Sequence, residues 1–230
     1  RLLEMDSVVL SYEPDDGNGH LRRDLQVSSN AYSYMYSQFE VAKLTASDAY
    51  TNDYFGYSVA ISGDTVVVGA YKENSGRGAA YIFRITDGGA TYSQVAKLTA
   101  SGSAYNDYFG YSVAIEGSTV VVGAYNKNDG CAQWSDPYTG VVFIFCSIDG
   151  GNTYAQVAKL KPTDCNQCRY DMYFGKSVAI YGDTVVIGAP ADTVSGPCTW
   201  PASQYSSNEG STYVFRTSDG GATYAEVAKL

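Results

Sequence analysis

The sequence predicts an all-β fold made of three tandem four-stranded antiparallel units, and three recurring motifs support that prediction. Phe-Gly begins at positions 55, 109 and 174, and Gly-Ala begins at positions 69, 123 and 188. Val-Ala-Lys-Leu ends at positions 44, 98, 160 and 230, with spacings of 54, 62 and 70 residues. Self-similarity on this scale is the signature of repeat architectures. We expect the units to lengthen through their loops while the strands keep their length.

Each unit is predicted to form four short strands, as its first copy illustrates. From Tyr57 to Ile61 small residues alternate with bulky ones, so one face of the strand is small and the other is bulky. A two-residue turn at Gly63-Asp64 suits a hairpin, and the apolar run Thr65–Ala70 after it predicts burial on both faces. The third and fourth strands are expected at Ala80–Ile85 and Tyr92–Leu98. The recurrent lysine of the fourth strand suits an outer edge, where charge discourages edge pairing: Lys43, Lys97, Lys159 and Lys229.

A four-stranded meander with a small-residue first strand and a doubly buried second strand is what a β-propeller blade requires. We therefore expect blades at residues 45–98, 99–160 and 161–230, within a repeat region that covers residues 37–230. Residues 1–36 are a non-repetitive segment. A stack of such sheets without ring closure is the alternative architecture. A β-sandwich fits less well, because the repeat is too regular.

The residues of the first strands resemble a known repeat. The run Phe55-Gly56-Tyr57-Ser58-Val59-Ala60, followed by Val68-Gly69-Ala70-Tyr71, is similar to the FG-GAP repeat of integrin-α-type propellers and of many secreted proteins. The Asp-Gly-Gly hairpins that start at Asp87, Asp149 and Asp219 resemble Asp-box turns, which shape a hairpin far from any catalytic centre. The resemblance implies a propeller-type fold and an extracellular setting, and it implies no activity.

The integrin-type calcium loop is absent from this pattern. Calcium-binding copies of the repeat carry several Asp residues between their first two strands. Here that connection is a two-residue turn with at most one Asp, and calcium needs about 6–8 oxygen ligands. We therefore expect no metal site and no cofactor.

Three blades are too few for a closed propeller, which has roughly four to eight. The chain is either a fragment or part of a structure that several chains complete, and we expect the second. Ser37–Leu44 is a fourth strand without partners, and Ser7–Tyr12 is a further strand upstream. In one hypothesis residues 1–36 pair with a neighbouring copy in a head-to-tail assembly. In the other hypothesis they cap one end of the array.

Composition narrows the classes of function. The net charge of −9 disfavours nucleic acid and anionic membranes as partners, and no apolar run approaches the ~20 residues that cross a bilayer. The single histidine, His20, lies outside the repeats, which excludes a histidine-based centre within them. The 22 tyrosines suit half-buried strands and lateral protein contacts.

The cysteines gather on long loops. Cys131, Cys165, Cys168 and Cys198 are all expected at one end of the blades, and Cys146 at the far end of a third strand. A secreted domain favours disulfides, with Cys168 joined to Cys198 and Cys131 to Cys165. A four-cysteine zinc site and free thiols are the alternatives. Cys146 would then be unpaired and buried, or joined to another chain.

The same loop-rich end carries four aromatic residues as tentative binding anchors: Trp134, Tyr138, Trp200 and Tyr205. Packing of the loops on themselves is the alternative role. Asp53, Asp107 and Asp171 precede each Phe-Gly, and a residue repeated in every unit more often caps a turn than catalyses a reaction. We expect no enzyme. The predicted function is an extracellular structural subunit that assembles with copies of itself as a filament, coat or surface appendage. An adhesion or glycan- or protein-recognition module is the alternative.

Overall fold

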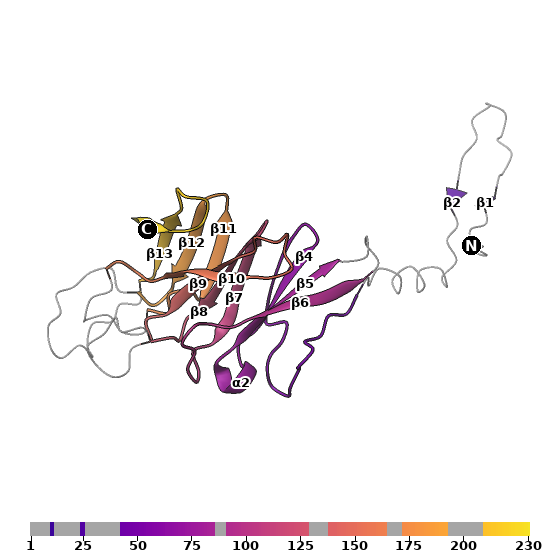
Figure 1. Ribbon diagram of the computed structural model, residues 1–230, viewed down its shortest axis with the longest axis horizontal. Coiled ribbons are helices and arrows are strands. Elements are labelled where there is room, and N and C mark those ends of the chain that lie inside the picture. Colours follow the sequence, from indigo (N-terminus) through magenta and orange to yellow (C-terminus); the bar gives the residue numbers. More distant parts are fainter. Residues whose placement is uncertain are drawn as a thin grey trace, which may run out of the picture. The chain divides into compact units, whose positions relative to one another are not determined.

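The computed structural model describes residues 10–11, 24–25, 42–85, 91–128, 138–164, 172–192 and 209–230 (Figure 1). The chain divides into two compact units, residues 1–43 and residues 44–230. In the first unit β1 (Leu10–Ser11) pairs antiparallel with β2 (Asp24–Leu25). The strand expected at Ser7–Tyr12 is described only at these two residues of β1.

The second unit contains three four-stranded antiparallel sheets, each in simple meander order, which confirms the predicted all-β blades. Blade 1 consists of β3 (Ser58–Ser62), β4 (Thr65–Ala70), β5 (Ala79–Ile85) and β6 (Tyr92–Leu98). Blade 2 consists of β7 (Phe109–Glu116), β8 (Thr119–Ala124), β9 (Val141–Cys146) and β10 (Ala155–Leu160). Blade 3 consists of β11 (Ser177–Tyr181), β12 (Thr184–Ala189), β13 (Ser211–Arg216) and β14 (Ala225–Lys229). In blade 1 the predicted strand bounds hold to within one residue.

Two-residue turns join the first two strands of every blade, as the sequence predicts. The flanking pairs are Ser62 with Thr65, Glu116 with Thr119 and Tyr181 with Thr184. The leading glycine of each turn has a φ of +54° or +55°. A residue with a side chain would be strained in this conformation. Glycine at this position therefore fixes the register of the hairpin.

The Asp-Gly-Gly hairpins between the third and fourth strands are held by their aspartates in blades 2 and 3. Asp149 accepts hydrogen bonds from the Ser147 hydroxyl at 2.8 Å and from the Thr153 amide at 2.9 Å. Asp219 has the same partners at the matching positions, Thr217 and Thr223. Hydrogen bonds from Thr153 and Ser147 lower the pKa of Asp149 well below its usual range. The corresponding hairpin of blade 1, residues 86–90, lies outside the described residues.

The second strand is the buried centre of each blade, because it has sheet neighbours at its edges and another blade over a face. In β4 and β8 nearly every side chain is buried, as the apolar runs predict. In β12 buried and half-buried residues alternate, with Val185 and Ile187 inside and Val186 and Gly188 partly open. One face of β12 therefore lacks the cover that β4 and β8 have.

A short helical turn, α2 (Glu73–Gly76), was not expected from the sequence. Two of its residues, Asn74 and Ser75, have positive φ, so it is a left-handed turn and not a regular helix. It lies in the connection from β4 to β5, where it packs beside blade 2. Its Gly76 carbonyl accepts a hydrogen bond from the Tyr108 amide at 2.9 Å.

Candidate functional site

The blades contact one another through the small face of the first two strands. A Cβ on Gly69 would lie 2.0 Å from the Gly110 carbonyl oxygen of the next blade, and a Cβ on Gly123 would lie 2.0 Å from that of Gly175. The neighbouring serines donate to the same oxygens, Ser58 to Gly110 at 2.8 Å and Ser112 to Gly175 at 2.7 Å. The predicted small face thus accommodates the backbone of the following blade.

The Phe-Gly segment of each following blade is held by the two residues just before β5 or β9. Gly78 forms a parallel bridge with Phe109, whose amide donates to the Arg77 carbonyl at 3.3 Å. The Phe174 amide donates in the same way to the Thr139 carbonyl at 3.0 Å. A Cβ on Gly78 or Gly140 would lie 2.0 Å from the phenylalanine carbonyl oxygen. We call the contact between two consecutive blades a seam. The seam between blades 1 and 2 and the seam between blades 2 and 3 therefore have the same structure.

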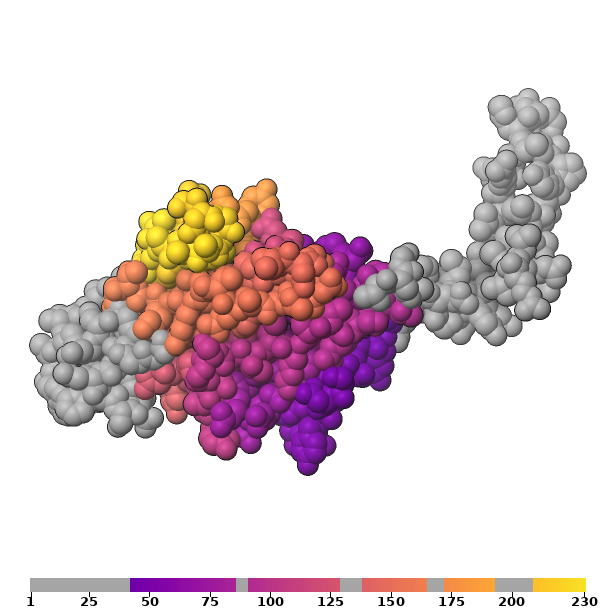
Figure 2. Space-filling model, in the orientation of Figure 1, coloured from indigo at the N-terminus to yellow at the C-terminus, as the bar shows by residue number. Residues whose placement is uncertain are grey.

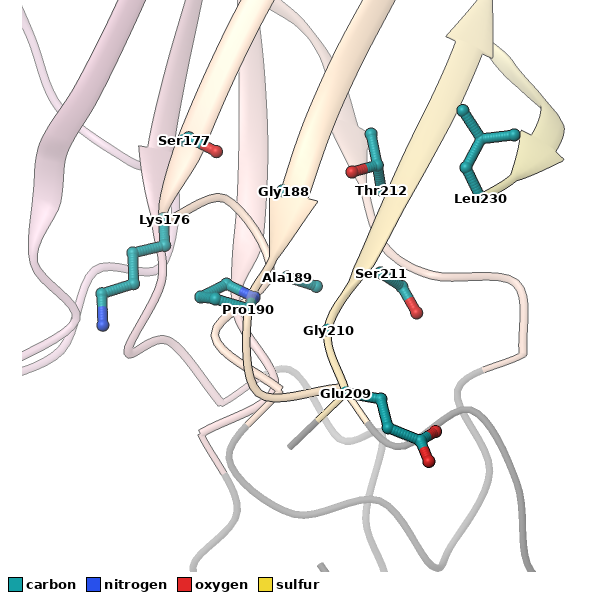
Figure 3. Close-up of a pocket in the computed structure, with 10 residues that line it drawn as sticks. All are labelled: Lys176, Ser177, Gly188, Ala189, Pro190, Glu209, Gly210, Ser211, Thr212 and Leu230. Carbon is teal, nitrogen blue, oxygen red and sulfur yellow. The ribbon is translucent and has the colours of Figure 1, made fainter. Parts of the chain in front are cut away.

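Blade 3 presents the matching positions without a following blade among the described residues. A pocket of about 530 Å³ opens there, and five of its lining residues stand where blades 1 and 2 hold a Phe-Gly segment: Ser177, Gly188, Ala189, Gly210 and Ser211 (Figure 3). A Cβ on Gly188 would meet no second blade, only Ser177 within its own sheet. Lys176 and Glu209 lie at the margins of the pocket. We call this surface the blade 3 face.

The opposite surface is the bulky face of β3, which we call the blade 1 face. Val59 and Ile61 are 66% and 64% exposed. The residues at the same positions of blade 2, Val113 and Ile115, are 9% and 8% exposed because they pack on blade 1. Figure 2 shows the described part of the second unit running from the indigo residues of blade 1 to the yellow residues that end blade 3. Its two outermost blades thus each expose one half of the seam.

The recurrent lysine of the fourth strand is paired with carboxylates in blades 1 and 3, which the sequence did not indicate. Lys97 contacts Asp48 at 2.5 Å and Glu73 at 3.0 Å, and Lys229 contacts Asp164 at 2.6 Å and Asp192 at 2.7 Å. Each ammonium group also lies over a tyrosine of the third strand, Tyr81 or Tyr213. These lysines tie the outer strand to the loops instead of only protecting an edge.

The charges of these clusters shift the pKa values of their members. The hydrogen bond from Lys97 is the main cause that lowers the pKa of Asp48. Burial disfavours the charge on Lys97, but hydrogen bonds with Asp48 and Glu73 outweigh it and raise its pKa. Burial, followed by the hydrogen bond to Asp192, raises the pKa of Tyr213. Lys97 therefore stays charged and Tyr213 stays protonated, which suits a structural role.

The aspartates before Phe-Gly cap turns where the structure describes them, as expected. Asp53 accepts from the Tyr50 amide at 2.8 Å, and Asp107 accepts from the Ala104 amide at 2.7 Å. Asp107 also forms a buried ion pair with Lys127 at 2.7 Å. Asp171 lies outside the described residues. Asp53 therefore holds its own turn, and Asp107 holds its turn and joins it to the connection that follows β8.

Seven tyrosines form one connected cluster across the three blades, with ring centroids 4.4–5.6 Å apart: Tyr54, Tyr57, Tyr71, Tyr108, Tyr111, Tyr125 and Tyr173. We call this set the tyrosine cluster. The Tyr57 hydroxyl of blade 1 donates to the Tyr111 hydroxyl of blade 2 at 2.8 Å. Lys72 and Lys176 lie over four of the other rings. This cluster was not predicted from the sequence, although tyrosine recurs at fixed positions around Phe-Gly and after Gly-Ala.

Most of the predicted binding and disulfide residues lie outside the described part of the chain and stay predictions. These are Trp134, Trp200, Tyr205, Cys131, Cys165, Cys168 and Cys198. Tyr138 is described and is 39% exposed, next to the seam between blades 2 and 3, where its carbonyl accepts from the Tyr173 amide at 3.4 Å. Cys146 is half-buried and forms no disulfide within the described residues, and its sulfur lies 3.6 Å from the Thr119 hydroxyl.

Metal-binding clusters and membrane-spanning helices are both absent from the described residues. Among them, no three His, Cys, Asp or Glu side chains are grouped to hold a metal ion. No helix within the described ranges has the length and apolarity to span a bilayer.

Comparison with known protein families identifies the repeat. A family model described as the FG-GAP repeat matches residues 39–83, 92–145 and 154–215, more than half of the chain. No curated protein matches the chain. Among solved structures, the crystal structure of Saccharomyces cerevisiae Sqt1 is similar over 78% of this chain, at 9% identity and a TM-score of 0.44. The chain spans 36% of that protein's chain.

Proposed function

Since the chain belongs to the FG-GAP repeat family, we propose that it is an extracellular structural subunit that assembles with copies of itself, head to tail. FG-GAP repeats typically occur in extracellular or surface proteins with adhesion and recognition roles. In the proposed assembly the blade 1 face of one copy docks on the blade 3 face of the next. Such a heterologous contact propagates into a ring or a filament.

The observation that supports the proposal is the match between the blade 3 face and the two internal seams. The pocket-lining glycine and serine of blade 3, Gly188 and Ser177, stand where Gly69 and Ser58 meet Gly110. The Phe55-Gly56 segment of a second copy would enter the pocket as Phe109-Gly110 enters its place on blade 1. The Gly56 carbonyl would then accept a hydrogen bond from Ser177.

The two faces also complement each other in shape and polarity. Docking would cover Val59 and Ile61, which are the exposed apolar side chains of the blade 1 face, with the small residues of β11 and β12. Burial of apolar area is the main driving term in such contacts. The net charge of −9 per copy opposes association at low ionic strength, so screening by salt should promote it.

Negative-stain electron microscopy and size-exclusion chromatography with light scattering test the proposal. The wild-type chain is expected to form rings or filaments that grow with concentration and with salt. Gly188→Ala places a Cβ where the incoming carbonyl would lie, and Val59→Asp puts a charge into the contact, so each should leave monomers. Ile148→Asp changes a 99% exposed isoleucine in the hairpin between β9 and β10, which is on neither docking face, so this control should assemble normally.

A wild-type chain that stays monomeric at all concentrations would overturn the proposal and favour the recognition alternative. In that case the blade 3 face would serve a further blade of a different chain or of a longer polypeptide. Binding of the monomer to a glycan array would then be the measurement of choice. The proposal includes no catalytic activity, because Asp53 and Asp107 are engaged in turns and an ion pair.

A further inference from the structure

One pair of the tyrosine cluster has a geometry that brings two hydroxyl groups together across the first internal seam. Tyr57 and Tyr111 come from different blades, yet their ring centroids are 4.8 Å apart and their hydroxyl groups are hydrogen-bonded at 2.8 Å. The pair therefore brings the phenol ends together, and not only the ring faces.

We propose that Tyr57 and Tyr111 are an oxidative cross-linking site, at which a dityrosine bond joins blade 1 to blade 2. Two tyrosyl radicals couple through ring carbons next to the hydroxyl-bearing carbon. That reaction requires the two phenol ends to be adjacent, as they are here. Tyr57 is 47% exposed in the single chain, so an oxidant in solution reaches the pair of an unassembled molecule directly.

The rest of the tyrosine cluster directs oxidation to this pair. The rings form a continuous path, so a radical formed on another tyrosine can pass along it by electron and proton exchange. Lys72 lies over Tyr71 and Tyr108, and Lys176 lies over Tyr125 and Tyr173. A cation over a ring opposes removal of an electron from it. No such cation contact involves Tyr57 or Tyr111 in the described part of the chain. A tyrosyl radical is therefore more stable on these two rings than on those four.

The chemistry balances with hydrogen peroxide as oxidant and a haem peroxidase as catalyst. Each phenol loses one electron and its hydroxyl proton to give a tyrosyl radical. One C–C bond forms between the two rings, two ring C–H bonds break, and the released protons restore both hydroxyl groups. In total the pair loses two electrons and two protons, which reduce one peroxide molecule to two water molecules. The chain becomes lighter by two hydrogen atoms.

Such a link would lock the first internal seam covalently. It closes a loop between positions 57 and 111, which removes freedom from the unfolded chain as a disulfide does. The linked protein should therefore melt at a higher temperature than the untreated protein. This outcome does not depend on self-assembly.

The test is treatment of the full chain with hydrogen peroxide and a haem peroxidase, followed by peptide mass spectrometry. To keep molecules apart, the reaction is run at low protein concentration and repeated in the Gly188→Ala variant. The expected product is a pair of peptides containing Tyr57 and Tyr111, joined with loss of two hydrogens, and a dityrosine fluorescence per molecule that does not depend on concentration. Tyr57→Phe and Tyr111→Phe keep the ring and should each abolish the product.

Tyr181→Phe is the matched control, because Tyr181 is 84% exposed and lies outside the tyrosine cluster. It should leave the yield of the Tyr57–Tyr111 product unchanged. Three results would overturn the proposal: no dityrosine at all, products spread over exposed tyrosines such as Tyr50 and Tyr105, or links only between molecules. Near-complete loss of fluorescence in Tyr57→Phe with normal circular dichroism would separate a chemical role from a folding defect.

Discussion

Gly123 and Gly188 occupy the same position of the repeat, but one lies in an internal seam and the other on an open face. At Gly123 an added Cβ would meet the Gly175 carbonyl at 2.0 Å, whereas at Gly188 it would meet only the rotatable Ser177 hydroxyl at 2.3 Å. The motif is therefore not a requirement of the single blade. It is one half of a contact between blades. Blade 3 has this half, at Gly188, but no following blade lies against it among the described residues.

The largest difference is expected between alanine substitutions at these two glycines. Gly123→Ala forces the backbone of blade 3 away and should cost more than about 3 kcal/mol in free energy of unfolding. Gly188→Ala should cost under about 1 kcal/mol, because only a serine side chain must rotate. Urea denaturation followed by circular dichroism measures both. Equal costs would show that the glycine serves its own blade and not the seam.

The bulky face offers a second matched pair. Ile115→Ala removes a buried side chain between blades 1 and 2 and should destabilise the protein by about 2–4 kcal/mol. Ile61→Ala, at the same position of the exposed blade 1 face, should change the stability of the monomer by less than about 0.5 kcal/mol. The same denaturation experiment applies, on protein dilute enough to remain monomeric. A large loss in Ile61→Ala would mean that the blade 1 face is already covered within one chain.

The serines provide a smaller contrast. Ser112→Ala leaves the buried Gly175 carbonyl without its side-chain donor and should cost about 1–2 kcal/mol. Ser177→Ala should be neutral in the monomer and weaken only the assembly. Comparing unfolding free energies with the concentration at which assemblies form separates the two effects. A stability loss at Ser177 equal to that at Ser112 would argue against its assignment to docking.

The smallest expected effect concerns pH and the Asp48–Lys97 pair of blade 1. The folded-state pKa of Asp48 lies below its unfolded value, so its contribution is present above about pH 4 and is lost as pH falls through the lowered pKa. Asp48→Asn should therefore flatten the acid side of the stability curve slightly, by well under 1 kcal/mol, because the pair is partly exposed. Thermal melts from pH 6 to pH 2 provide the comparison. If the stability of Asp48→Asn fell more steeply than that of the wild type as the pH was lowered, the pKa of Asp48 would not be lowered by folding.

The strands and turns could be predicted from the sequence because they depend on local patterns. The Gly63-Asp64 turn and the apolar run Thr65–Ala70 specify a hairpin and a buried strand with no distant partner needed. The small face of β3 was also visible, but its partner was not, since Ser58 donates to a carbonyl 52 positions away. Periodicity shows that a face is special and does not show what lies against it.

The tyrosine cluster and the ion pairs of Lys97 and Lys229 could not be predicted from the sequence, for the same physical reason. Tyr57 and Tyr111 are 54 positions apart, and Lys97 meets Asp48 at a separation of 49. In each case the partner belongs to another blade or another loop, and local sequence patterns do not reveal contacts between residues so far apart in the chain. The lysine suggested edge protection because charge on an outer strand has that role when it is unpaired.

Sedimentation velocity on a mixture of two blocked variants tests the head-to-tail claim most directly. Val59→Asp disables the blade 1 face and leaves the blade 3 face intact, while Gly188→Ala does the opposite. Each variant alone should sediment as a monomer, and an equimolar mixture should form a one-to-one dimer and nothing larger. A mixture that stays monomeric, or a single variant that dimerises with itself, would contradict the account.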